Sequence, residues 1–285
     1  MNIIITEFLS NLFPIYIKYI FEAITMLAEQ YTVVVIACMI YWCINKDLGR
    51  RLSLILSGGI GFNGFFKNVF RVPRPFDISD KVSVLRKSTA TGYSFPSGHT
   101  QNASVLAGIL KNKFTRKSIR AVIITYAFLV AFSRLVLGVH YLTDVIAALI
   151  IGFGWAYFGN KLYEAVKENT FKYLWFLVPA FLSIIPLFIK GTIPPQSNDV
   201  FTGVGISLGA VLGTMLEVKY ISFTIEGSIK RRIIRFVLGI LLLLLLLSGL
   251  KAVLPDTSAM RVLRYFCVGI FASCGMPFLI KKFSI

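Results

Sequence analysis

Nine apolar segments of helical length constrain this chain more than any other feature. They cover residues 25–45, 50–70, 98–112, 118–138, 140–161, 171–190, 199–217, 233–253 and 260–280. Most of them have about the 20 residues that an α-helix needs to cross a bilayer. Only 15% of the residues are charged, against about a quarter in soluble domains. The sequence therefore predicts an all-α fold, a polytopic membrane bundle of about nine transmembrane helices.

The residues before the first apolar segment show a different pattern. Glu7, Asn11, Lys18 and Glu22 recur at intervals of four and seven, which places them on one face of a helix. We expect an N-terminal interfacial helix, which Pro14 can divide into two shorter pieces. The alternative is a first crossing helix whose polar face points into the bundle. Because the first charge comes only at residue 7, we do not expect a cleaved signal peptide.

The distribution of basic residues predicts the orientation in the membrane. The chain has 30 Lys and Arg residues and a net charge of +17. They lie in clusters between apolar segments, which argues against a nucleic-acid-binding face. Alternating loops place more than half of them on one side, which the positive-inside rule makes cytoplasmic. The C-terminus is then cytoplasmic, and the N-terminus lies on the extracytoplasmic side.

Three short blocks contain the reactive side chains. They read Lys67-x6-Arg74-Pro75, Pro96-Ser97-Gly98-His99 and Ser133-Arg134-x5-His140-x3-Asp144. Both histidines of the chain lie in these blocks, together with three cations and a carboxylate. Every block falls at the same predicted outer end of the helices, as a single site requires. We therefore expect the active site on the extracytoplasmic face.

These residue types suit the transfer of a phosphoryl group through histidine. On a helix His140 and Asp144 share a face, so the carboxylate can orient the imidazole as a nucleophile. His99 is then the expected general acid, and exchanged roles for the two histidines stay open. The start of a helix at Ser97 and Gly98 offers backbone amides to an anion. The expected clamp for the remaining phosphate oxygens consists of Lys67, Arg74 and Arg134.

Two further residues are candidates for supporting contacts. Asn63 lies one helical turn before Lys67 and can orient it or line the floor of the site, and Tyr93 precedes the second block and can contact substrate. The four cysteines fall within apolar segments without metal-ligand spacing, and the outer carboxylates form no ligand cluster. We expect no metal and no other cofactor. Gly205, Gly209 and Gly213 predict close packing against another helix of the same chain.

The three blocks resemble the signature of the type 2 phosphatidic acid phosphatase superfamily, also called lipid phosphate phosphatases. Its members are mostly membrane-embedded, metal-independent phosphatases. The nine-helix arrangement is similar to that of glucose 6-phosphatase and of the sphingosine 1-phosphate phosphatases. The resemblance implies the same roles for His140 and Asp144. We expect one membrane domain over 1–285, with a catalytic phosphatase core at 25–165 and additional C-terminal transmembrane helices at 166–285.

The resemblance implies a function as an integral membrane phosphatase that removes the terminal phosphate of a lipid phosphate or diphosphate. Family members act on phosphatidic acid, phosphatidylglycerol phosphate, polyprenyl diphosphates or sphingoid phosphates, and this sequence does not select among them. A sugar-phosphate phosphatase and a lipid-linked phosphotransferase are the enzymatic alternatives. An anion-binding transporter is the non-enzymatic one. We expect a lipid phosphate substrate and membrane lipids as partners, no nucleic acid, and find no support for an oligomer.

Overall fold

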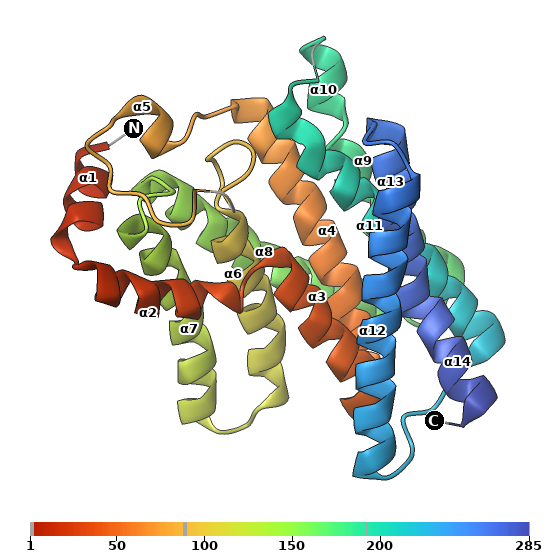
Figure 1. The fold of residues 1–285 in the computed structure, drawn as a ribbon. Coiled ribbons are helices and arrows are strands. Elements are labelled where there is room, and N and C mark those ends of the chain that lie inside the picture. Colours follow the sequence, from red (N-terminus) through yellow and green to blue (C-terminus); the bar gives the residue numbers. More distant parts are fainter. Residues whose placement is uncertain (1–2, 88–89, 192, 285) are drawn as a thin grey trace.

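Helices make up every regular element that the computed structural model describes, over residues 3–87, 90–191 and 193–284 (Figure 1). The first half contains α1 (Ile3–Leu12), α2 (Ile15–Met26), α3 (Gln30–Met39), α4 (Lys46–Phe70), α5 (Pro75–Ile78), α6 (Gly98–Leu110), α7 (Lys117–Val136) and α8 (Leu142–Val166). The second half contains α9 (Val178–Leu182), α10 (Ile185–Ile189), α11 (Asn198–Leu216), α12 (Ile229–Val253), α13 (Ser258–Ile270) and α14 (Met276–Phe283). Turns of π-helix extend α3 over Ile40–Ile44 and α11 over Glu217–Ile221, and join α13 to α14 over Phe271–Gly275.

Six helical segments of the described chain are long and apolar enough to cross a membrane. They are Lys117–Val136, Leu142–Val166, Thr170–Ile189, Pro195–Ile221, Ile229–Val253 and Ser258–Phe283, and the bent pair α1 and α2 can supply a seventh. The protein is thus an integral membrane protein with the predicted all-α polytopic fold. The predicted count of nine is not confirmed. Helices occur at the three remaining places, but α6 has 13 residues, Gln30–Ile44 is also short, and α4 carries several charges.

The N-terminal segment forms two helices, α1 and α2, that meet at an angle of 112° beside Pro14. The division at this proline is confirmed, and α2 runs crosswise to α7 and α12 (Figure 1). The polar face contacts the chain between α5 and α6. Lys18 Nζ donates to Ser83 Oγ at 2.7 Å, and Asn11 Nδ2 donates to the Lys81 carbonyl at 2.8 Å. These helices therefore hold the loop that precedes the second sequence block.

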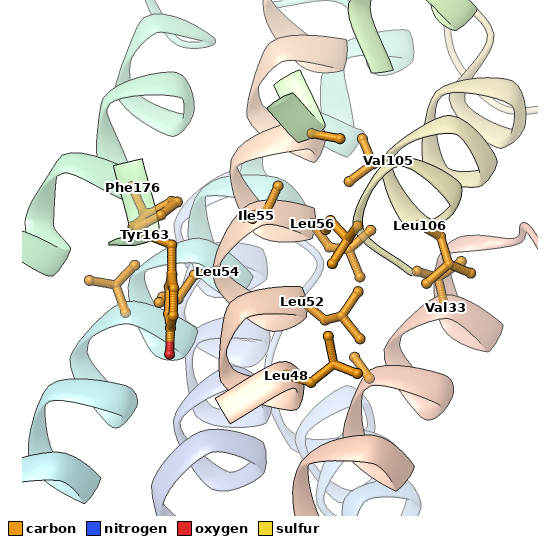
Figure 2. Close-up of a cluster of buried hydrophobic side chains, with 14 of the residues drawn as sticks. Val33, Leu48, Leu52, Leu54, Ile55, Leu56, Val105, Leu106, Tyr163 and Phe176 are labelled. Carbon is orange, nitrogen blue, oxygen red and sulfur yellow. The ribbon is translucent and has the colours of Figure 1, made fainter. Parts of the chain in front are cut away.

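Helix α4 runs through the main hydrophobic cluster. Leu52, Leu54 and Ile55 are fully buried. Figure 2 shows this helix between side chains of α3 and α6 on one side and Tyr163 and Phe176 on the other. Close packing of this kind holds membrane helices together, because lipid leaves little hydrophobic driving force between them. The packing fixes the C-terminal end of α4, where Lys67 lies.

Helices α11 and α13 approach each other at the glycine repeat. A Cβ atom at Gly205 would overlap the Val262 carbonyl oxygen, and one at Gly209 would overlap that of Phe266. Only glycine permits this backbone distance. The prediction that the repeat packs against a helix of the same chain is confirmed.

Candidate active site

The three sequence blocks meet at one cavity of about 410 Å³ beside the C-terminal end of α4. Seven of the residues predicted from the sequence line it: Asn63, Lys67, Arg74, Gly98, His99, Arg134 and His140. Asp144 lies behind His140, whereas Ser97 and Tyr93 are not among the described residues of the cavity wall. The blocks come from α4, the loop after it, the start of α6 and the junction of α7 with α8. Helix packing therefore assembles residues that are up to 77 positions apart.

His140 and Asp144 are paired and buried. His140 Nδ1 lies 3.2 Å from Asp144 Oδ2, and the same oxygen accepts hydrogen bonds from Ser94 Oγ at 2.5 Å and from the Tyr141 amide at 2.9 Å. Asp144 stands in the first turn of α8, where the helix dipole favours a carboxylate. The carboxylate thus fixes the orientation of the imidazole ring.

The contact with Arg74 defines the tautomer of His140. Arg74 Nη1 lies 3.1 Å from His140 Nε2. A guanidinium can only donate, so Nε2 must accept and the ring proton must lie on Nδ1, facing Asp144. Burial, followed by the charges of Arg74 and Arg134, lowers the pKa of His140 well below its usual value. A neutral imidazole with its lone pair on Nε2, the atom that faces Arg74, is the form that a nucleophile requires.

The three cations differ in how many of their donors are engaged. Arg74 donates to the carbonyl oxygens of Thr91, Gly92 and Val139 at 2.6–3.1 Å. Burial lowers its pKa to about 10, which still leaves it charged at neutral pH. It therefore holds the loop before α6 against the segment that contains His140, as well as carrying charge.

Arg134 and Lys67 keep donors available. Arg134 is 1% exposed and donates to Thr25 Oγ1 at 3.3 Å, and its Nε has no partner within the described chain. Lys67 is 8% exposed, and its Nζ makes no hydrogen bond or ion pair with any described residue. Buried donors of this kind are costly unless an anion satisfies them. Together they suit the oxygens of a tetrahedral oxyanion.

The second block contributes Gly98 and His99 to the cavity wall. Ser97 precedes α6, and its amide donates to the Asp144 carbonyl at 3.2 Å, which ties this block to the third. A Cβ atom at Gly98 would meet only Asn63 Oδ1, at 3.6 Å, so the backbone stays open to the cavity. His99 Nε2 is buried, and no described residue supplies a hydrogen-bond partner.

Asn63 supports the second block rather than Lys67. Its Nδ2 donates to the Pro96 carbonyl at 3.3 Å and to Gln101 Oε1 at 3.0 Å. The two residues predicted to make supporting contacts, Asn63 and Tyr93, therefore differ in where the structure places them. Asn63 positions the turn before His99, and Tyr93 has no described place in the cavity.

Several residues that the sequence did not single out complete the site. Ser94 orients Asp144, as its 2.5 Å hydrogen bond shows. The cavity wall also contains residues at the start of α3, in α6 and in the C-terminal helices: Glu29, Gln30, Tyr31, Asn102, Asp199, Thr202, Arg261 and Tyr265. No spacing or motif marks these residues, because their position depends on how distant helices pack. The sequence therefore predicts the histidines and cations that line the cavity but not the residues of the wall beyond them.

Comparison with known proteins assigns the family. Residues 49–168 match the PAP2 superfamily, and residues 201–285 match the transmembrane extension of PAP2 superfamily phosphatases. The two matches together span more than half of the chain. The protein belongs to the PAP2 superfamily, as its sequence blocks predict.

The individual relatives share only a quarter to a third of their residues with this chain over the aligned regions. A lipid A 4'-phosphatase of Bacteroides thetaiotaomicron is 33% identical over 97 residues, which cover 33% of this chain and 43% of that protein. A probable sphingosine-1-phosphate phosphatase of Dictyostelium discoideum is 25% identical over 229 residues, which cover 71% and 53%. The crystal structure of Aquifex aeolicus LpxE aligns with a TM-score of 0.47 at 24% identity, over 55% of this chain and 92% of that one. The chain spans about half the length of the curated relatives it matches.

Proposed function

We propose that this protein is an integral membrane phosphatase that removes the terminal phosphate of a lipid phosphate or diphosphate. The observation that carries the proposal is the pairing of His140 with Asp144 beside buried cations in one cavity. Binding of an anion requires the cations alone, whereas an oriented nucleophile serves a reaction. The lipid substrate is supported by the relatives, which include lipid A, sphingosine 1-phosphate and undecaprenyl diphosphate phosphatases.

The reaction proceeds in two displacements at phosphorus. In the first, His140 Nε2 attacks phosphorus, the bond from phosphorus to the ester oxygen breaks, and His99 donates a proton to that oxygen. Asp144 stabilises the positive charge that develops on the imidazole of His140. The product is an alcohol, or a shorter phosphate if the substrate is a diphosphate, together with a phosphohistidine at His140.

In the second displacement a water molecule attacks the phosphohistidine. His99, now unprotonated, accepts a proton from this water, the bond from phosphorus to Nε2 breaks, and inorganic phosphate leaves. Lys67, Arg134 and the amides at Gly98 stabilise the charge on the phosphoryl oxygens in both transition states. Arg74 releases its contact with Nε2 when phosphorus bonds there and donates to a phosphoryl oxygen instead.

The charge stabilisation that a divalent metal supplies in other phosphatases comes here from three fixed cations. We propose a reaction that needs no metal and no other cofactor. Full activity in excess chelator is the expected result. Loss of activity under chelator, with an unchanged melting temperature, would contradict this part of the proposal.

The proposed orientation has the active site on the extracytoplasmic face and the C-terminus in the cytoplasm. Support comes from basic residues at the opposite end of the bundle, where α4 and α12 begin and where α6 joins α7 (Figure 1). Examples are Lys113 and Arg116 in the chain between α6 and α7, and Arg232 near the start of α12. Basic loops of this kind mark the cytoplasmic side.

A sugar-phosphate phosphatase is the second candidate, and the polar cavity wall favours it. Gln30, Asn102 and Thr202 line the same cavity as the histidines and can donate to sugar hydroxyls. A phosphotransferase uses the same phosphohistidine and differs only in the acceptor that replaces water.

The test is phosphate release by purified protein in excess chelator. The substrates are phosphatidic acid, phosphatidylglycerol phosphate, undecaprenyl diphosphate, sphingosine 1-phosphate and glucose 6-phosphate, each beside the His140→Ala variant. Release from a lipid that the variant abolishes supports the proposal. Release from glucose 6-phosphate alone would replace it with the second candidate. No release from any substrate would overturn the hydrolase assignment.

A further inference from the structure

A short segment before the second sequence block, residues 91–94, holds the guanidinium of Arg74. Arg74 Nη2 donates to the Thr91 carbonyl at 2.6 Å, and Arg74 Nε donates to the Gly92 carbonyl at 3.1 Å. The remaining nitrogen, Nη1, lies 3.1 Å from His140 Nε2. The direction in which Nη1 points therefore depends on where these two carbonyl groups lie.

The segment is held at its two ends by different parts of the chain. At Ser94 the amide donates to the Val72 carbonyl at 2.8 Å, and the hydroxyl donates to Asp144 at 2.5 Å. At Thr91 the hydroxyl donates to Asp199 Oδ2 at 3.1 Å. Asp199 lies in the first turn of α11. A helix from the C-terminal half of the chain thus holds the end of the segment that carries the Thr91 carbonyl.

The segment also lies directly against the start of α11 at Gly92. The φ angle of Gly92 is +66°, in the left-handed region that favours glycine, and a Cβ atom there would lie 2.9 Å from the Gln196 carbonyl oxygen. The same atom would lie 3.3 Å from Asp199 Oδ2 and 3.6 Å from Lys67 Nζ. Because it has no side chain, Gly92 fits between the chain that leads into α11 and the lysine of the first block.

We infer that Asp199 is a positioning residue for the proposed reaction, because through Thr91 it holds the two carbonyl groups that aim Arg74 at the phosphoryl group. The inference rests on the proposed function and deepens it. A cation stabilises a transition state best when its donors already point to where charge develops. Thr91 is exposed, so burial does not hold it in place of this hydrogen bond. The C-terminal helices would thus contribute to the reaction through the orientation of Arg74.

Two substitutions at Asp199 separate its hydrogen bond from its charge. The amide oxygen in Asp199→Asn can still accept from Thr91, whereas Asp199→Ala has no acceptor. We expect kcat to fall about fivefold in Asp199→Ala, as for the loss of one hydrogen bond, and to stay near the wild-type value in Asp199→Asn. Thr91→Val should match Asp199→Ala, and Thr91→Ser should keep the wild-type kcat. The matched control is Asp80→Ala, which removes an exposed carboxylate between α5 and α6 and should leave kcat unchanged.

A double-mutant cycle shows whether Asp199 acts through Arg74. In an Arg74→Ala background, Asp199→Ala should have no further effect on kcat, because no guanidinium remains to be aimed. The same further loss in both backgrounds would overturn the inference, and so would equal losses in Asp199→Ala and Asp199→Asn, since the carboxylate would then act by its own charge. An unchanged kcat in Asp199→Ala would overturn it as well. If Asp199→Ala does not fold, Thr91→Val takes its place in the cycle.

Vanadate binding separates failure of this inference from failure of the proposed function. Bound vanadate can adopt the trigonal-bipyramidal geometry of phosphoryl transfer, and its affinity is measured without turnover. We expect its Kd to be about fivefold higher in Asp199→Ala than in the wild type, and nearly unchanged in Asp199→Asn. A wild type that shows this pattern but releases no phosphate would keep the role of Asp199 and remove the phosphatase. Equal vanadate affinity in the three proteins would remove the positioning role, even if the wild type is an active phosphatase.

Discussion

The buried cations at the two ends of α4 differ in whether a carboxylate lies beside them. At the N-terminal end, Lys46 Nζ and Arg50 Nη2 lie 2.7 Å and 3.1 Å from the carboxylate oxygens of Glu217, whose side chain is fully buried. At the C-terminal end, Lys67 has no such partner among the described residues, and Arg134 keeps an unpaired Nε. One end of α4 thus carries cations that are paired with a carboxylate, and the other end lies at a cavity whose cations, Lys67 on α4 and Arg134 on α7, have unused donors.

The difference separates stability from function. A buried cation with a carboxylate partner is a structural contact, and removing the partner leaves an expensive unpaired charge. Buried cations without a partner lower stability, and a protein keeps them where a ligand supplies the missing anion. Variants at the C-terminal end should therefore change activity, and variants at the N-terminal end should change stability.

The largest expected effect is at the two histidines. His140→Ala should lower kcat/KM by at least about 10⁴-fold on every substrate, because the nucleophile is lost. His99→Ala should lower it by about 10²–10⁴-fold on an alkyl phosphate and much less on p-nitrophenyl phosphate, whose leaving group needs no proton. Steady-state kinetics with both substrates measures the contrast. The opposite pattern, rescue of His140→Ala by the activated ester, would exchange the roles of the two histidines.

The next effect comes from the same substitution at both ends of α4. Lys67→Met should lower kcat by about 10²–10³-fold, because one donor to the phosphoryl oxygens is lost. Its melting temperature should stay equal or rise. Lys46→Met should keep kcat and lower the free energy of unfolding by about 1 kcal/mol, since this side chain is partly exposed. Equal effects of the two variants on kcat would remove the distinction between the ends.

Glu217→Gln tests the ion-paired cluster of Lys46, Arg50 and Glu217 directly. It leaves two cations facing an amide, so the free energy of unfolding should fall by about 3 kcal/mol. The fraction that remains folded should keep its kcat. Thermal melting and kinetics on the same preparation measure both, and Glu226→Gln at an exposed position is the control. A fall in kcat of the folded fraction would connect this cluster to the reaction.

Ser94→Ala has the smallest expected effect. Asp144 loses the 2.5 Å hydrogen bond from Ser94 but keeps the Tyr141 amide and His140, so kcat should fall about tenfold. Ser104→Ala is the control, since this buried hydroxyl donates only within α6, to the Thr100 carbonyl. Equal kcat for Ser94→Ala and wild type would show that Asp144 orients His140 without the serine.

The sequence predicted which histidines and cations lie together better than it predicted the rest of the cavity wall. The motif blocks correctly predicted that both histidines and the cations line one cavity. Hydropathy places the blocks at helix ends on the same side of the membrane, so they can meet. The number of crossing helices did not follow, since α4 carries charges that belong to the ion cluster rather than to loops. The sequence predicted an interfacial helix or a first crossing helix for α1 and α2, but not the hydrogen bonds from their polar face to the loop at Lys81 and Ser83. Those contacts and the C-terminal part of the cavity wall depend on tertiary packing. No short sequence pattern predicts them.

The most direct test of the account is the effect of inorganic phosphate on thermal stability. Phosphate should raise the melting temperature of the wild type, because it satisfies the unpaired cations of the folded protein. Lys67→Met should lose most of this increase, and Lys46→Met should keep it from a lower starting value. The same increase in all three proteins, or none in the wild type, would contradict the claim that the C-terminal end of α4 is built for a phosphate.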